Sequence, residues 1–353
     1  MTFNIKEFTR ENKVIFILAA FAVLLFLFRD MFGLVFITYV MCFITHSATE
    51  AIHKKFKINR RLIILGIYLV FLVAIAALIL LVMPRLLNEA KSFGEQIPVS
   101  LRKIEAWAAT VDNSYAMPAF ERLKEFLTPD QMLLRGWAIG RAFLEKGLQY
   151  GSWFFIGLLF SFLIMLDLPK LLRGVRGLRF TRLSEVYEET AGSVVLFAKV
   201  VGENFRAQLI ISAVNTVLTA IGLYILGVKA VVLLCTVVFF CGLMPVLGVF
   251  ISSVPIFLMA VNTGGIVLGL WSLVMIVIIH AIEAYILNPR IVSAVMSINP
   301  VMTLIILYIA HSLIGIWGML LGIPISVYIY RQIVLGQKPQ RKDEENTDVG
   351  GEG

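Results

Sequence analysis

The stretch AVVLLCTVVFFCGLMPVLGVFISSVPIFLMAV, residues 230–261, decides the fold class of this chain. It carries no charged side chain and is longer than the ~20 apolar residues with which a helix crosses ~30 Å of hydrocarbon. Its centre holds Gly242, Pro245 and Gly248, which are residues that interrupt helices. Non-helical backbone survives at membrane depth only where protein or a water-filled cavity surrounds it. The stretch therefore predicts a membrane segment divided into two half-length pieces.

The rest of the chain has the same apolar character. Of its 353 residues, 59% are hydrophobic and 15% are charged, and the mean hydropathy is +0.89. Soluble domains carry about a quarter charged residues. This composition excludes a water-soluble domain and predicts an all-α, polytopic protein with about seven or eight membrane segments, including broken or re-entrant helices.

Apolar runs alternate with charged breaks and divide the chain into distinct regions. The third apolar run is expected to end at Pro84, since proline interrupts a helix. The predicted regions are N-terminal membrane helices in 1–83, an extracytoplasmic amphipathic helical region in 84–147, a membrane helix in 148–168, cytoplasmic amphipathic helices in 169–206, a C-terminal membrane transport core in 207–335 and a disordered tail in 336–353.

The net charge of +8 comes from basic residues that lie between apolar runs. They do not form one basic face with interleaved aromatic residues, so nucleic acid is not an expected partner. Because cytoplasmic loops are enriched in Lys and Arg, the clusters in 54–61 and 170–182 are expected in the cytoplasm. Charges nearly balance in 84–147, which suits the outer side. The pattern predicts a multi-pass protein of the cell membrane with both termini cytoplasmic.

A second apolar run, 300–330, is also interrupted, here by Gly315, Gly318, Gly322 and Pro324. Each broken run fits either a re-entrant hairpin or a single kinked crossing, and both topologies leave the C-terminus inside. Breaks near the middle of each run favour hairpins. Between the two runs, 266–287 reads as a regular span that ends at Asn288 and Pro289.

Several blocks in the C-terminal third carry a family resemblance. They are GLMPVLG at 242–248, SVP at 253–255, Glu283 followed by LNPRI at 287–291, INP at 298–300 and GIWGMLLGIP at 315–324. Together they resemble the AI-2E (autoinducer-2 exporter) family of bacterial membrane proteins, although Ser293 stands where many relatives carry glycine. The resemblance implies a homo-oligomeric secondary transporter without nucleotide binding. It leaves the substrate open, since members are linked to export of a signalling molecule, to sodium/proton exchange and to sporulation.

The broken runs are candidates for the transport path. Discontinuous helices place half-helix ends and free carbonyls near the midplane, where transporters hold ions and polar substrates. The alternative is a kinked helix packed on its neighbours. Replacing Pro245 or Gly318 with Ala is predicted to impair flux by letting the half-helices continue. Path candidates are Gly242, Pro245, Gly248, Gly315, Gly318, Gly322 and Pro324, with Asn288, Pro289, Asn299 and Pro300 at neighbouring helix ends.

Two ionisable residues, His280 and Glu283, lie three apart in an apolar run. Ionisable groups within membrane segments are costly and usually functional. One interpretation is a proton-exchanging carboxylate with a histidine neighbour. The other places Glu283 near the interface, where it snorkels or caps a neighbouring helix. Asn215 and His311 are expected to be hydrogen-bond partners between helices.

Signatures of enzymes, cofactors and metal sites are absent from the sequence. We expect no cofactor and no metal, and we interpret Cys42, Cys235 and Cys241 as small buried residues. The predicted function is secondary transport of a small polar solute or ion, coupled to protons or sodium. Expected partners are the lipid bilayer, the solute and further copies of the chain. The alternatives are a non-transporting scaffold in sporulation or envelope assembly and, less favoured, an intramembrane hydrolase.

Overall fold

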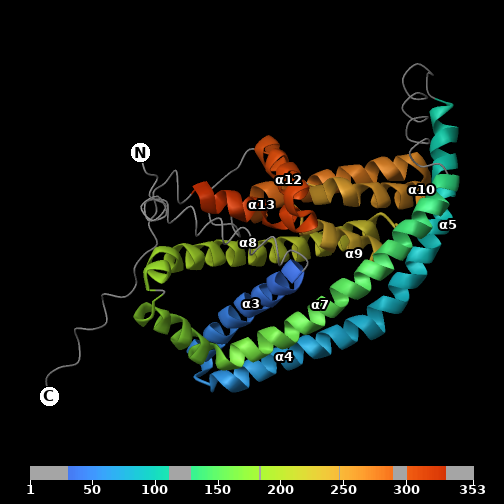
Figure 1. The fold of residues 1–353 in the computed structure, drawn as a ribbon. Coiled ribbons are helices and arrows are strands. Elements are labelled where there is room, and N and C mark those ends of the chain that lie inside the picture. Colours follow the sequence, from blue (N-terminus) through green and yellow to red (C-terminus); the bar gives the residue numbers. More distant parts are fainter. Residues whose placement is uncertain (1–30, 111–128, 183, 246, 289–299, 331–353) are drawn as a thin grey trace, which may run out of the picture. The chain divides into compact units, whose positions relative to one another are not determined.

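The computed structural model describes residues 31–110, 129–182, 184–245, 247–288 and 300–330. Every regular element in these ranges is a helix. The principal ones are α3 (Phe32–Phe56), α4 (Arg60–Ala77), α5 (Met83–Ala108), α7 (Pro129–Gly177), α8 (Ser184–Ile225), α9 (Val231–Gly242), α10 (Leu247–Ile282), α12 (Pro300–Ile314) and α13 (Ile316–Ile329), as Figure 1 shows.

Among the described residues, five helical runs are long and apolar enough to cross a membrane. They are Phe32–Phe56, Arg60–Ala108, Gly151–Phe180, Val186–Ile225 and Leu247–Leu287, with shorter apolar helices at Val231–Gly242, Val301–Leu313 and Trp317–Ile329. Large apolar side chains are widely exposed, whereas the serines Ser161, Ser212 and Ser272 are fully buried. This distribution fits a chain whose solvent is lipid. The prediction of an all-α, polytopic membrane protein is confirmed.

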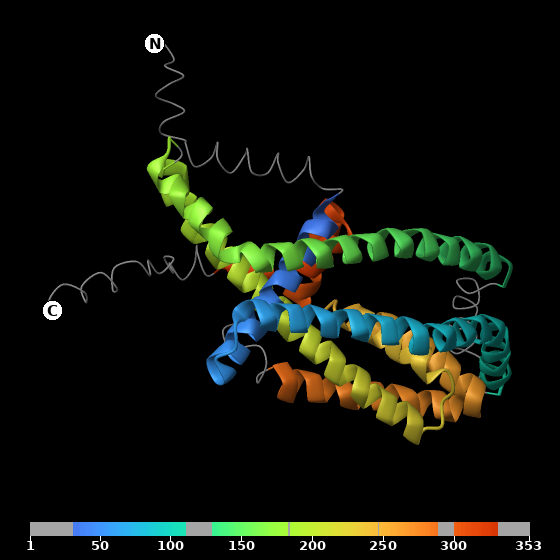
Figure 2. The ribbon, with the colours of Figure 1, turned by 90° about the horizontal axis from the view of Figure 1, so that it is seen from below.

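The expected helix end at Pro84 is wrong. The chain stays helical from Arg60 to Ala108, and Figure 1 and Figure 2 show α4 and α5 as one curved run. Proline lacks an N–H and its ring collides with the carbonyl four residues earlier, here that of Leu80. A wide π-helical turn at Leu78–Val82 lies at that carbonyl. Such turns insert into α-helices without ending them, so the helix tolerates Pro84.

Two compact units make up the chain. One comprises Met1–Ile64, Tyr150–Glu203 and Leu307–Gly353, and the other comprises Leu65–Gln149 and Asn204–Ile306. In the first unit, glycines let helices approach closely. A Cβ atom on Gly33 of α3 would lie 2.3 Å from the Trp317 ring and 2.6 Å from the Trp153 ring. The Tyr39 hydroxyl donates a hydrogen bond to the carbonyl of Ala198 in α8.

The second unit has an apolar core built by three helices. Its buried members are Leu223 and Val228 at the end of α8, Leu234 and Val238 of α9, and Ile256, Met259 and Ala260 of α10. The amphipathic face of α5 covers a neighbouring part of α10, since Ile104 and Ala108 pack with Leu258 and Val261. The second unit therefore contains the first broken run, and part of the 84–147 region packs against that run through α5.

Helix α10 is a hairpin of two arms, 247–263 and 266–282, and Figure 1 shows the arms side by side. Gly264 has φ −137° and ψ 20°, and Gly265 has φ 75° and ψ −171°, a conformation that only glycine adopts readily. A Cβ atom on Gly269 would lie 2.6 Å from the Val261 side chain and 2.9 Å from that of Phe257. The two arms are therefore antiparallel and in close contact.

Candidate functional site

The first predicted break is a tight turn between α9 and α10. Backbone hydrogen bonds run from the N–H of Met244 to the carbonyl of Cys241 (2.8 Å) and from the N–H of Gly248 to the carbonyl of Met244 (3.1 Å). A Cβ atom on Gly248 would lie only 2.0 Å from the Cys241 carbonyl oxygen. Because α9 and the first arm of α10 share one core, the chain doubles back at this turn.

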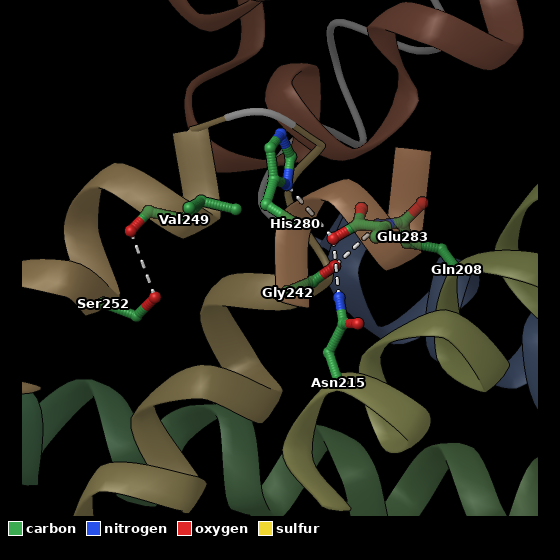
Figure 3. Close-up of polar contacts among 7 residues, drawn as sticks. All are labelled: Gln208, Asn215, Gly242, Val249, Ser252, His280 and Glu283. Atoms are coloured by element: carbon green, nitrogen blue, oxygen red, sulfur yellow. Dashed lines mark hydrogen bonds and ion pairs between the residues drawn. The ribbon is translucent and has the colours of Figure 1, made fainter. Parts of the chain in front are cut away.

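A polar stripe on α8 binds the end of α9. Gln208 donates a hydrogen bond of 2.6 Å to the carbonyl of Gly242, and Ser212 donates one to the carbonyl of Phe239. The last carbonyls of a helix have no partner within it, and inside a membrane each unpaired group is costly. The stripe therefore satisfies part of the broken backbone with side chains, and Figure 3 shows the contact between Gln208 and Gly242.

The next residue of the same stripe reaches the predicted carboxylate. Asn215 Nδ2 donates a 2.6 Å hydrogen bond to Glu283 Oε2, and His280 Nδ1 lies 3.4 Å from the same oxygen. Figure 3 shows the three side chains converging. The Glu283 side chain is 13% exposed and that of His280 is 44% exposed. Buried Asn215 Oδ1 has no hydrogen-bond partner among the described residues.

Glu283 begins a π-helical turn, Glu283–Leu287, that continues the second arm of α10. Such turns are rare and recur at functional sites, since they shift side chains and carbonyls out of α-helical register. The backbone N–H of Asn288 donates to the carbonyl of Glu283 at the end of this turn. The element that presents the carboxylate is therefore itself an irregular helix.

The second predicted break belongs to the other unit. Gly315 has φ 61° and ψ −141°, and its N–H donates to the carbonyl of His311 at 2.8 Å. A Cβ atom on Gly318 would lie 1.9 Å from the Ala310 carbonyl oxygen, so α13 starts in close contact with the end of α12. Gly322 and Pro324 are buried within α13.

The residues of the predicted path are divided between the two units. Gly242, Pro245, Gly248, His280, Glu283 and Asn288 lie in the second unit, whereas Gly315, Gly318, Gly322 and Pro324 lie in the first. Pro289 and Asn299 lie outside the described residues, and Pro300 is the first residue of α12. The Glu283 carboxylate is directed to the Asn215 side chain of α8.

Two site residues were missed at the level of sequence. Gln208 and Ser212 precede Asn215 by seven and three positions, so all three fall on one face of α8. The expectation that Asn215 is a hydrogen-bond partner between helices is confirmed. The spacing of polar residues along 208–219 was the signal that could have revealed the whole stripe.

Side chains of α5 bind the start of α9 and the end of the first arm of α10, away from the turn that joins these two helices. The Glu89 carboxylate accepts a 2.7 Å hydrogen bond from the N–H of Leu233 in the first turn of α9, whose N-cap Ala230 offers no side-chain acceptor. Lys103 donates to the carbonyl of Asn262, at the end of the first arm of α10. An acid at a helix N-terminus and a base at a C-terminus are both stabilising. Helix α5 therefore braces both hairpin helices.

We expect Glu89→Ala to lower stability, because it leaves the N–H of Leu233 without its acceptor. Loss of a side-chain cap costs about 0.5–2 kcal/mol. Thermal unfolding in mild detergent would measure the change. Glu95→Ala is the matched control, since Glu95 is exposed on the same helix. Equal effects of the two substitutions would contradict the bracing role.

Comparisons with known proteins agree with this architecture. Residues 15–335 match the family model described as AI-2E family transporter. The chain is 27% identical over 333 residues to the Bacillus subtilis (strain 168) protein named "Putative transport protein YdbI", covering 92% of each chain. It is 23% identical over 291 residues to the "Sodium-lithium/proton antiporter" of Halobacillus andaensis, covering 78% of this chain and 82% of that protein.

The family match spans both units and every described helix, and it includes both broken runs. The names of the relatives indicate a transporter rather than an enzyme. Together with the apolar helices, they support a multi-pass membrane protein. The chain belongs to the AI-2E transporter family.

Proposed function

We propose that this protein is a cation-coupled secondary transporter in which Glu283 is the group that binds and releases the coupling ion. The observation that carries the proposal is the Glu283 carboxylate held 2.6 Å from Asn215 within an apolar span. The transported species is a small polar solute or an ion. The coupling ion is a proton or an alkali cation.

The electrostatics of the site support this role. A carboxylate in an apolar span has few ways to be neutralised, and the described residues offer it one amide donor and one histidine. A carboxylate so placed favours uptake of a proton or of a small cation. Asn215 Oδ1 is buried and unpaired among the described residues, and it would be a second oxygen ligand for a bound cation. The side chain of His280 is half-exposed, which suits a group that passes protons to and from Glu283.

The name of one relative supports cation coupling. One similar protein is named a sodium-lithium/proton antiporter, which makes sodium, lithium and protons the first cations to test. The broken backbone beside the site adds carbonyl groups, such as that of Gly242, next to the polar stripe of α8. Half-helix ends and unwound carbonyls are how many secondary transporters hold their ions.

Flux through purified protein in liposomes tests the proposal. We expect sodium, lithium or proton movement when gradients of these ions are imposed, and none in liposomes without protein. An absence of flux under all gradients would favour the scaffold alternative. Cleavage of a peptide substrate by the same preparation would favour the hydrolase.

The orientation in the membrane is a separate prediction. We expect the 84–147 region outside and the 169–206 region inside, because of the charge distribution between spans. In a background without native cysteines, Asp112→Cys should react with an impermeant thiol reagent in intact cells. Glu185→Cys should react only after lysis. Labelling at position 185 but not at position 112 would show the opposite orientation and contradict the prediction.

We also propose that copies of the chain associate, with the N-terminal hairpin or the 84–147 region at the interface. The family membership supports this expectation. Native mass spectrometry in mild detergent would give the number of subunits. A spectrum that contains monomer alone would contradict the proposal.

A further inference from the structure

The C-terminal end of α7 is an amphipathic segment that continues directly from a membrane span. Basic residues recur every third position at Lys170, Arg173 and Arg176, while Leu171, Leu172 and Val175 lie between them. At about 3.6 residues per turn these two sets fall on roughly opposite sides of the helix. The segment therefore has one basic face and one apolar face.

Both faces are open to the surroundings. Val175 on the apolar face is 52% exposed, and Phe180, in the short 3-10 helix Leu178–Phe180, is 92% exposed. On the basic face, Lys170 pairs with Asp167 at 3.0 Å, and both side chains are largely exposed. Within residues 167–182, five basic residues stand against this single acid. The segment therefore presents net positive charge beside uncovered apolar side chains.

Helix α7 is bent near its C-terminal end (Figure 1). Pro169 lies inside α7, and Figure 1 shows that α7 bends toward its C-terminal end. A proline removes one helical hydrogen bond and is a common cause of such a kink. A kink at the end of the apolar run lets the amphipathic segment turn away from the direction of the span.

We propose that residues 170–180 lie in the headgroup layer and bind anionic phospholipid. The apolar face would contact the acyl chains and the basic face would contact the lipid phosphates. The segment is the C-terminal part of the helical run Gly151–Phe180, which is long and apolar enough to cross a membrane. This position keeps it beside the bilayer, which makes lipid a better occupant than a soluble protein. The leaflet concerned is the cytoplasmic one if the orientation proposed above is correct.

The positive-inside rule alone does not explain why the basic residues of this segment lie on one helix face. The positive-inside rule requires Lys and Arg near the ends of spans but places no demand on their spacing. Basic side chains on one face, with uncovered apolar side chains on the other, are the pattern of a helix that lies in the membrane surface. The spacing is thus the observation that points to a bound lipid surface.

Spin labelling of the full-length protein would test the depth of the segment. In a cysteine-free background, a label at Val175→Cys should be accessible to oxygen and shielded from an aqueous nickel complex. This result is expected in vesicles of phosphatidylcholine and phosphatidylglycerol, with less shielding in phosphatidylcholine alone. A label that contacts water equally in both vesicles would overturn the proposal.

Charge neutralisation tests the lipid preference. Native mass spectrometry should show that the triple variant Arg173→Gln, Arg176→Gln, Arg179→Gln loses bound phosphatidylglycerol by about tenfold or more, and that the corresponding Arg→Lys variant retains it. The control variant Lys338→Gln, Arg341→Gln, Lys342→Gln removes equal charge from the C-terminal tail. An equal loss in the control would assign the effect to net charge and overturn the proposal. Labelling of Glu185→Cys would confirm that the triple variant keeps its orientation.

Discussion

Replacing Glu283 with Gln is expected to abolish the pH dependence of flux and to lower cation-coupled flux by about tenfold or more. The amide keeps the shape of the side chain and can still accept the hydrogen bond from Asn215. It cannot exchange a proton, and it lacks the charge that binds a cation. We therefore expect expression and oligomeric state to be unchanged, because the contact between α8 and the π-turn is retained. Flux into proteoliposomes at several pH values would measure the effect.

Glu203→Gln is the matched control for this experiment. Glu203 lies on α8, is half-exposed and pairs with Lys199 at 3.9 Å. Its substitution should leave flux and its pH dependence unchanged. If Glu283→Gln retains full flux with a normal pH profile, then the carboxylate is structural. The coupling site would then depend on the broken backbone and on asparagine side chains alone.

Replacing Gly248 with Ala is expected to produce the largest loss of stability in the second unit. The added methyl group would lie 2.0 Å from the Cys241 carbonyl oxygen and 3.1 Å from the Gly242 nitrogen. Both neighbours are backbone atoms, so no rotamer change relieves the contact. The turn between α9 and α10 must open, which disturbs the hydrogen bond from Gln208 to Gly242. Overpacking in a well-packed core costs about 1–3 kcal/mol or more.

Thermal unfolding in detergent would compare this variant with Gly66→Ala. No atom lies within 4 Å of a Cβ built on Gly66 in α4, and alanine favours helix over glycine by about 1 kcal/mol. The control should therefore be unchanged or slightly more stable. Equal stability of the two variants would mean that the close approach at Gly248 does not exist.

Gly318→Ala is expected to behave like Gly248→Ala in the first unit, since its methyl group would lie 1.9 Å from the Ala310 carbonyl oxygen. The sequence predicts impaired flux at Gly318 because a half-helix would continue. The structure supplies a different cause. The glycine is needed because two helix ends approach each other, and the turn itself is made by Gly315, which has positive φ.

Features encoded locally could be predicted from the sequence. The fold class follows from apolar runs of membrane length, and the positions of both breaks follow from Gly and Pro within them. Glu283 is conspicuous because a carboxylate in an apolar run is rare. Each of these inferences needs only the immediate neighbours of a residue in the chain.

The sequence could not predict that the helix continues through Pro84, because this depends on the conformation of the preceding helical turn. Proline predicts a break, yet the π-turn at Leu78–Val82 lies where the ring would collide with the preceding turn. The apolar pattern does not distinguish a helix that ends at proline from one that widens before it. Only the backbone conformation decided between the two.

Hydrogen bonds between residues far apart in the chain were likewise set by the tertiary structure. Asn215 and Glu283 are 68 positions apart, and Glu89 and Leu233 are 144 apart. The sequence alone determined that residues 230–287 form apolar, interrupted membrane segments with one carboxylate, Glu283. Which α8 side chains bind that carboxylate and the free carbonyls was set by the packing of α8, α9 and α10, because a hydrogen bond depends on distance in space rather than on position in the chain.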